Sequence, residues 1–301
     1  MKLHHLRDLL AVTEKGSIRA AAKHLGLGQP ALSRSLRDLE QELGVPLLDR
    51  RPHGAVLTEL GELFSRRAGA AFNELRRARE EIEQHQGAVH GQIVICLSSL
   101  SHIALLPSAL TPFRTRYPQV ELRILEGAYP SVERRLVDGT IDFFVGPLTS
   151  AVIAPGLQQE NLFDNYRIVI ARKDHPLVQA TSLADLIQAD WITTSITNDP
   201  GAEFNDLFLT HGLPPPRLAL RADSLLTMMI SMISTDMLAI SPRQYATTPL
   251  LAGMVRRVPI RERLAGPSVF LIQRASIPLT PAAEYLADLL RRAAVRQRKD
   301  E

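Results

Sequence analysis

Two runs of sequence decide the fold of the first part of the chain: Ser17-Ile18-Arg19-Ala20-Ala21-Ala22-Lys23-His24-Leu25 and Gln29-Pro30-Ala31-Leu32-Ser33-Arg34-Ser35-Leu36-Arg37. The first run is rich in alanine and begins with serine, which favours a short helix capped by Ser17. Gly26-Leu27-Gly28 predicts a tight turn. Pro30 suits the first turn of a second helix, where a missing N–H costs nothing. Two helices joined by such a turn form a helix-turn-helix.

The second helix of this pair has an apolar side and a polar side. Its apolar side carries Leu32, Leu36, Leu39 and Leu43, at the three- and four-residue steps of a buried helix face. A helix fits the major groove of DNA with its first residues on base edges, which arginine, glutamine and serine can read and proline can touch. The alternative for the arginines is an ordinary solvated surface. The residues expected to contact DNA here are Gln29, Pro30, Ser33, Arg34 and Arg37.

The flanks of this motif extend the same module. Residues 3–14 predict a preceding helix, and residues 47–57 predict a two-stranded wing that turns at Pro52-His53-Gly54. Arg50 and Arg51 on the wing would hold DNA phosphates, which adds affinity without reading sequence. Ser17 could donate to a phosphate at the start of its helix, or it could serve only as the helix cap.

A long helix is expected over residues 59–86, which contain no proline. An apolar heptad seam runs along it, with steps of four and three residues. A lone helix of this kind has nothing of its own to bury the seam against, so the seam predicts dimerisation. The alternative is packing against the chain's own body. The members of the seam are Phe64, Ala68, Ala71, Leu75, Ala78 and Ile82.

The quoted runs, with Leu43-Gly44-Val45-Pro46-Leu47-Leu48-Asp49-Arg50 and Leu57-Thr58-Glu59-Leu60-Gly61, resemble the DNA-binding domain of LysR-type transcriptional regulators. Gly28, Leu48 and Leu60 stand where that family usually has Ser, Phe and Ala, and they keep a capping or apolar residue. The resemblance implies a regulatory region like a periplasmic binding protein, with two subdomains around an effector cleft. It also implies binding to double-stranded DNA as a dimer of dimers, a small-molecule effector, and action on RNA polymerase.

After Gly87-Ala88-Val89-His90-Gly91 the sequence changes to strands that alternate with helices. Apolar strands at 93–97, 120–125 and 218–220, with helical crossovers between strands, predict a parallel sheet. The expected fold class is α/β with an N-terminal all-α winged helix-turn-helix, a long linker helix and a two-subdomain regulatory region. The expected boundaries are 1–58 for the DNA-binding domain, 59–87 for the linker and dimerisation helix, 88–161 with 274–301 for regulatory subdomain I, and 162–273 for subdomain II.

Ligands of open α/β sheets bind beyond the carboxyl ends of the strands. The ends expected here carry small, hydroxyl or apolar residues and no acid. Ser98 and Ser99 precede a helix, so they could hold an anion, or they could form a cap without a ligand. The sequence therefore predicts a small organic anion as effector. The residues expected to bind it are Ser98, Ser99, Tyr129, Gly146, Thr149, Ser195, Ile196 and Ser241.

Motifs in the regulatory region narrow the resemblance within the LysR-type family. Tyr129-Pro130, Asp138-Gly139-Thr140-Ile141-Asp142-Phe143 and Leu279-Thr280-Pro281-Ala282-Ala283 are similar to the branch that contains the toluenesulfonate-degradation regulator.

The composition argues against several other classes of protein. The chain has 301 residues, a net charge of +3 and 45% hydrophobic residues, which is ordinary for a globular protein. No apolar run approaches the roughly 18 residues of a membrane span. No signal-peptide pattern opens the sequence, so a cytoplasmic location is expected. The lone Cys96 is expected to be a small buried hydrophobe, with a redox sensor as the alternative.

Enzyme chemistry finds little support in the sequence. The sequence shows no phosphate loop, no nucleophile elbow and no histidines at metal-ligand spacing, so no cofactor, metal or catalytic residue is expected. Two alternatives to a regulator are a ligand-binding α/β module and an enzyme with an appended DNA-binding domain. The first 61 residues argue against the former, and the lack of a convergent acid, base or nucleophile argues against the latter.

Overall fold

The computed structural model describes residues 1–51, 54–149, 152–194 and 200–299. The chain forms two compact units, Met1–Ala88 with Val137–Ile141, and Val89–Leu136 with Asp142–Glu301. Each unit has a hydrophobic core of its own. Within the described ranges, no helix combines the length and the hydrophobicity that crossing a membrane requires.

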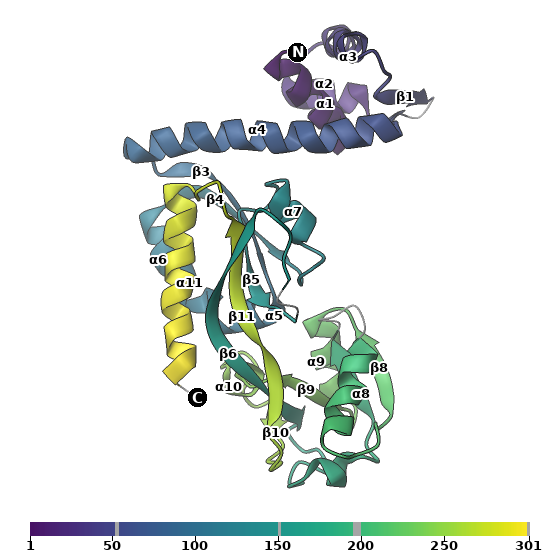
Figure 1. Ribbon diagram of the computed structural model, residues 1–301, viewed down its shortest axis with the longest axis vertical. Helices are drawn as coiled ribbons and strands as arrows, with labels where there is room; N and C mark the ends of the chain where they lie inside the picture. Colours follow the sequence, from purple (N-terminus) through teal and green to yellow (C-terminus); the bar gives the residue numbers. More distant parts are fainter. Residues whose placement is uncertain (52–53, 150–151, 195–199, 300–301) are drawn as a thin grey trace. The chain divides into compact units, whose positions relative to one another are not determined.

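The first unit opens with three helices, drawn in purple tones in Figure 1. They are α1 (Leu3–Lys15), α2 (Ile18–Leu25) and α3 (Gln29–Leu43). The Ser17 hydroxyl accepts the Ala20 N–H at 3.1 Å and so caps α2. Gly26 ends this helix at a φ of 66°, a left-handed conformation that favours glycine. Leu32 and Leu36 are buried in one core with Leu9 of α1, which confirms the helix-turn-helix and its apolar side.

A two-stranded wing and a long helix complete this unit. The wing strands β1 (Leu48–Arg51) and β2 (Gly54–Leu57) pair antiparallel. The Glu40 carboxylate on α3 accepts the N–H groups of Leu47 at 2.8 Å and Leu48 at 3.0 Å, so the wing is attached directly to α3. The long helix α4 (Glu59–His85) begins at Thr58, whose hydroxyl accepts the Gly61 N–H at 2.9 Å.

The described part of the second unit contains a nine-stranded sheet. Its strands are β3 (His90–Leu97), β4 (Gln119–Glu126), β5 (Phe143–Pro147), β6 (Leu157–Arg172), β7 (Trp191–Thr194), β8 (Leu218–Ala222), β9 (Leu238–Pro242), β10 (Val255–Arg257) and β11 (Leu264–Arg274). The helices are α5 (Ser99–Ala104), α6 (Leu106–Arg116), α7 (Glu133–Val137), α8 (Pro200–Thr210), α9 (Leu225–Ser234), α10 (Gln244–Thr247) and α11 (Pro281–Lys299), with a 3₁₀ helix at Leu183–Leu186.

The sheet is mixed, so the expectation of a parallel sheet is wrong for its central strands. β3 pairs parallel with β4 and β5, and β7 pairs parallel with β8 and β9. Between these two parallel sets lie β6 and β11, which pair antiparallel with each other and with the strands beside them. They are 16 and 11 residues long because they run from one set to the other. The pattern of short apolar strands and crossovers predicts only the parallel sets.

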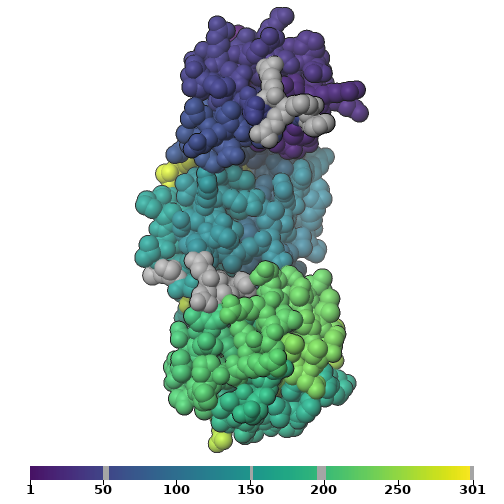
Figure 2. Space-filling view, turned by 90° about the vertical axis from the view of Figure 1, so that its right-hand side faces the viewer, coloured from purple at the N-terminus to yellow at the C-terminus, as the bar shows by residue number. Residues whose placement is uncertain are grey.

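Two lobes result, joined by β6 and β11, and this confirms the two-subdomain regulatory architecture. The core of the first lobe surrounds β3 and includes Phe113 of α6 and Leu286 of α11, two helices that lie side by side (Figure 1). The cores of the second lobe surround β7 and β9 and include Phe208 and Met228. Figure 2 shows much of the first lobe in teal and much of the second in green.

Candidate functional site

The outer face of α3 carries the polar residues that were expected to read DNA. Gln29, Arg34 and Arg37 are exposed, and Ser33 is half-buried beside them. The Arg37 Nε donates to the Ser33 carbonyl oxygen at 3.2 Å, one turn earlier on the helix. Exposed guanidinium and amide groups on one helix face can offer paired hydrogen bonds to flat base edges. Pro30 is exposed in the first turn of the same helix.

Buried polar contacts with α1 hold α3 in its orientation. Asp8 is only 2% exposed, and its Oδ2 accepts the Ser35 hydroxyl of α3 at 2.6 Å. Its Oδ1 accepts a hydrogen bond from the Arg7 guanidinium at 2.8 Å. Hydrogen bonds of this kind stabilise a carboxylate that is removed from water. The sequence gives no sign of this role, because Asp8 is spaced like any acid on a helix surface.

Three further residues were expected to hold phosphates. Ser17 is the cap of α2, so its hydroxyl oxygen already accepts one N–H, while its O–H can still donate to a ligand. Arg50 and Arg51 lie in β1, and their side chains are outside the described part of the structure.

The apolar seam expected along α4 divides into two parts. Phe64 packs against the core of the first unit and Ala68 is buried, so this end of the seam contacts the chain's own helices. The remaining members, Ala71, Leu75, Ala78 and Ile82, are exposed, Leu75 by 53% and Ile82 by 61%. The later part of α4 therefore presents an uncovered apolar stripe, spaced by four, three and four residues.

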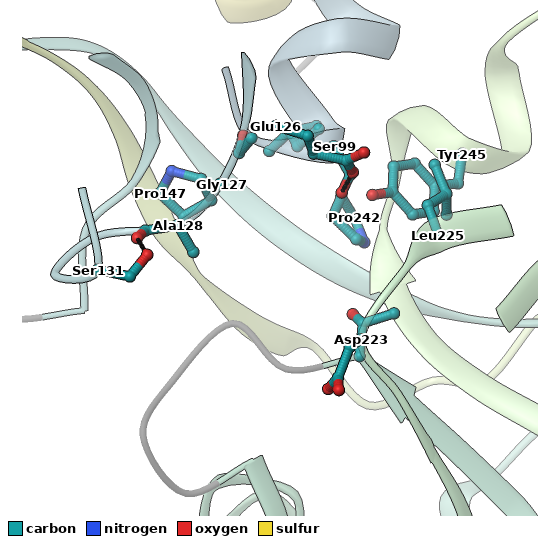
Figure 3. Close-up of a pocket in the computed structure, with 13 residues that line it drawn as sticks. Ser99, Glu126, Gly127, Ala128, Ser131, Pro147, Asp223, Leu225, Pro242 and Tyr245 are labelled. Carbon is teal, nitrogen blue, oxygen red and sulfur yellow. Dashed lines mark hydrogen bonds between the residues drawn. The ribbon is translucent and has the colours of Figure 1, made fainter. Parts of the chain in front are cut away.

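A cavity of about 510 Å³ lies at the carboxyl ends of the strands of the second unit, between its two lobes. Glu126, Pro147, Thr194 and Pro242, the last residues of β4, β5, β7 and β9, all line it. Figure 3 shows the side chains that converge on it from both lobes. This is the usual place for a ligand in an α/β sheet, and the volume suits a small molecule. We call this cavity the pocket.

The expectation that the strand ends carry no acid is wrong. Both Glu126 and Asp223 line the pocket. β4 ends at Glu126, one residue beyond the expected strand 120–125, and β8 ends at Ala222, two residues beyond the expected strand 218–220. The expected ligand-facing end after strand 120–125 was residues 127–129, which passes over Glu126, and the end of strand 218–220 was not among the expected ends, so both carboxylates were missed.

Ser98 and Ser99, two of the residues expected to bind the effector, line the pocket. Gly146 and Ser241 do not, because successive strand residues point to opposite sides and the next residue of each strand lines it instead. Ser241 is buried, and its hydroxyl has no hydrogen-bond partner within the described residues.

The remaining residues expected to bind the effector are not found in the pocket. Tyr129 is buried, and its hydroxyl donates to the Glu133 carboxylate and accepts the Ala154 N–H at 3.3 Å. The Tyr129 hydroxyl is therefore engaged within the first lobe. Thr149 is exposed outside the pocket lining. Ser195 and Ile196 lie outside the described residues.

Two family models match this chain and together span most of it. One, described as "LysR substrate binding domain", matches residues 86–295. The other, described as "Bacterial regulatory helix-turn-helix protein, lysR family", matches residues 3–62. The chain belongs to the LysR family of transcriptional regulators. It is therefore a regulator with a helix-turn-helix DNA-binding domain and a substrate-binding domain, and not an enzyme.

Individual LysR-type proteins resemble the chain over most of its length. The transcriptional regulator GalR of Pseudomonas putida is 26% identical over 293 residues, which cover 97% of this chain and 74% of GalR. The regulator GbpR of Rhizobium radiobacter is 30% identical over 260 residues, covering 83% of this chain and 84% of GbpR. The crystal structure of full-length CbnR complexed with its target DNA has a TM-score of 0.70 at 21% identity, covering 97% of this chain and 100% of CbnR, and so shares the fold.

The pocket of this LysR-type regulator contains a linked set of polar groups. The Ser99 hydroxyl donates to Glu126 Oε1 at 2.6 Å. Tyr245 of α10 lines the pocket beside Ser99, and Figure 3 shows its phenol directed toward that residue. Burial raises the pKa of the Tyr245 phenol, and a hydrogen bond with Ser99 lowers it by less. The phenol therefore stays protonated at any physiological pH. Sequence periodicity did not suggest Tyr245, because α10 has only four residues.

Cys96 lies on β3 of the LysR substrate-binding domain and is 1% exposed. Burial raises the pKa of its thiol to about 12. A thiol that stays protonated is a poor nucleophile, so the environment matches the role of a small core residue. Among the described residues, no group of three His, Cys, Asp or Glu side chains is arranged to hold a metal ion.

Proposed function

We propose that this LysR-type regulator reads its operator with the outer face of α3, and that a small molecule in the pocket modulates this binding. The observation that carries the first part is a polar face of α3 on which Gln29, Arg34 and Arg37 are exposed beside the half-buried Ser33. Asp8 ties this helix to α1. In this proposal the arginines pair with guanine, Gln29 pairs with adenine, and Ser33 pairs with either.

Contacts to the DNA backbone hold this face in register. Arg50 and Arg51 of the wing bind phosphates, and the Ser17 hydroxyl donates to a third at the start of α2. Pro30 lies against a sugar or a thymine methyl. The attachment of the wing to α3 through Glu40 supports separate roles for base reading by α3 and phosphate binding by the wing. It fixes where the wing lies when α3 enters the major groove.

Two apolar surfaces support assembly as a dimer of dimers. The first is the exposed stripe on α4 that ends at Ile82. The second is on α9, where Leu226, Ile230 and Ile233 are 70%, 53% and 38% exposed at steps of four and three residues. Ile82→Glu should convert the assembled protein to a smaller species in sedimentation velocity. An unchanged sedimentation coefficient would exclude the α4 stripe as an interface.

Each part of the chain has one task in this proposal. Residues 1–58 bind double-stranded DNA and 59–87 link and dimerise, while 88–161 with 274–301 and 162–273 form the lobes that hold the effector. The DNA-bound assembly then acts on RNA polymerase. The closer resemblance to the toluenesulfonate branch stays a prediction. The anionic effector expected from Ser98 and Ser99 does not agree with the acidic residues that line the pocket.

Base selection by α3 tests the proposal most directly. Operator sites are first selected from random duplexes, and binding is then measured at several salt concentrations. Arg34→Ala should weaken operator binding about 5- to 150-fold and relax the preference at one or two base pairs. Arg50→Ala should weaken all sequences alike and lower the salt slope by about 1.

Arg256→Ala provides the matched control, because this exposed arginine of β10 belongs to the second unit. It should leave both base preference and salt slope unchanged. If Arg34→Ala kept the full base preference of the parent protein, the reading face would lie elsewhere.

A further inference from the structure

The charge of the pocket argues against an anionic ligand. Among its described lining residues, Glu126 and Asp223 are acidic, and none is lysine, arginine or histidine. A carboxylate or sulfonate that entered the pocket would lie close to the like charge of Glu126, and no basic side chain in the described lining would offset the repulsion.

The hydroxyls that were expected to hold an anion are already engaged. Ser98 is buried, and its oxygen accepts the Ser101 N–H at 3.2 Å and lies 3.0 Å from the Ser101 hydroxyl. The Ser99 hydroxyl donates to Glu126 at 2.6 Å. The helix that follows, α5, has only six residues, so its dipole adds little. Both serines therefore serve the protein's own groups, and one of them faces a carboxylate.

Glu126 is the group in this pocket that most clearly needs a donor. It is exposed at the pocket wall, and a carboxylate offers about four lone-pair positions. Within the described part of the chain, Ser99 is the one donor recorded for it. Figure 3 places Glu126 beside Ser99, with Gly127 and Pro147 nearby. A ligand that brings N–H donors and positive charge would complete this carboxylate's hydrogen bonding.

We propose that the effector is a small organic amine whose ammonium group donates hydrogen bonds to the Glu126 carboxylate. Its apolar part would lie against the remaining lining, which includes Leu100, Ala128, Pro147, Leu225 and Pro242. Asp223 lines the pocket from the opposite lobe. The identity of the ligand class rests on the proposed role of the pocket as the effector site.

Matched pairs of amines and carboxylates test this class. Thermal unfolding of the full-length protein is measured with benzylamine, cyclohexylamine and putrescine, and with benzoate and cyclohexanecarboxylate. At least one amine should raise the Tm by several degrees, because a ligand that binds only the folded state stabilises it. The carboxylates should leave the Tm unchanged.

Two glutamate variants then locate the bound amine by calorimetric titration. Glu126→Gln should raise the Kd of the stabilising amine about tenfold or more, because a hydrogen bond to a charged group is replaced by one to an amide. Glu121→Gln is the matched control, since Glu121 is exposed on the same strand but does not line the pocket. It should leave the Kd unchanged.

Three results would each overturn the amine proposal. One is the absence of stabilisation by every amine tested, another is amine binding that Glu126→Gln leaves unchanged, and the third is carboxylate binding that Glu126→Gln strengthens. Operator selection by α3 is measured without any effector, so it would stand in all three cases. A protein that failed to select an operator would instead contradict the proposed DNA reading, whatever its response to amines.

Discussion

The DNA-reading face and the pocket differ in how they are built. The reading face is one side of α3, so a single helix and the contacts of Asp8 and Glu40 set all of its side chains together. The pocket is lined by the ends of strands from two lobes, including Glu126 of β4 and Pro242 of β9. A change that displaces α3 should therefore abolish recognition of the operator at every base contact. Most changes near the pocket should instead weaken a single contact to the ligand.

Gly61→Ala should have the largest effect and should fall only on the first unit. A Cβ at Gly61 would come within 2.0 Å of the Leu47 carbonyl oxygen, and that backbone cannot move aside without disturbing the wing. We expect a loss of about 3 kcal/mol or more of unfolding free energy, at the upper end of overpacking costs. Operator binding should be lost, while benzylamine or another stabilising amine should still bind. Thermal unfolding, operator titration and calorimetry provide the three readings.

Gly69→Ala supplies the control on the same helix. A Cβ there would lie 3.5 Å from Leu10 Cδ2, an ordinary van der Waals distance, and alanine favours a helix over glycine. It should keep or slightly raise the Tm and should keep operator binding. If Gly61→Ala also retained operator binding, the position of the wing against α4 would not matter for reading, and the contrast between the two sites would fail.

The sequence predicts the reading face better than the pocket, because the first lies on one helix and the second is assembled from several strand ends. The leucine spacing of α3 identified its buried side and therefore its exposed residues, because a helix repeats its geometry locally. The pocket depends on where strands end and on β6 and β11, which cross between lobes and follow no crossover pattern. Glu126 was missed because the ligand-facing residues after that strand were expected at 127–129, and Asp8 and Tyr245 depend on tertiary contacts that have no local signature.

Gly146→Ala should have an intermediate effect, confined to the second unit. A Cβ at Gly146 would come within 2.4 Å of Phe144 Cζ and 2.9 Å of Ser98 Cβ. Phe144 Cζ is the far end of a side chain, whereas Ser98 Cβ can move only with the Ser98 backbone, so we expect a loss of about 1–3 kcal/mol of unfolding free energy. Movement of Ser98 would disturb the start of α5 and weaken amine binding, while operator binding without ligand should persist.

Thr149→Ala is the companion variant, because Thr149 is exposed and outside the pocket lining. Calorimetry should show an unchanged Kd for the amine. If Gly146→Ala left ligand binding unchanged, the pocket would tolerate displacement at a strand end. Assembly of the pocket from many elements would then not make its ligand affinity sensitive to such changes.

The reactivity of Cys96 should show the smallest effect, and it tests whether the strand beside the pocket stays closed. Burial raises the pKa of the Cys96 thiol from its ordinary value of 9.0 to about 12. The native protein should therefore react with iodoacetamide at pH 8 about a thousandfold more slowly than the unfolded chain. Because the folded state favours the neutral thiol, its contribution to stability is complete below pH 9.0 and falls as the pH rises toward 12. Mass spectrometry of the alkylated protein measures the rate. Rapid alkylation of the native protein would mean that β3 opens near Ser98 and that the wall of the pocket is mobile. Of the two sites, only the DNA-reading face on α3 would then be held in a fixed position.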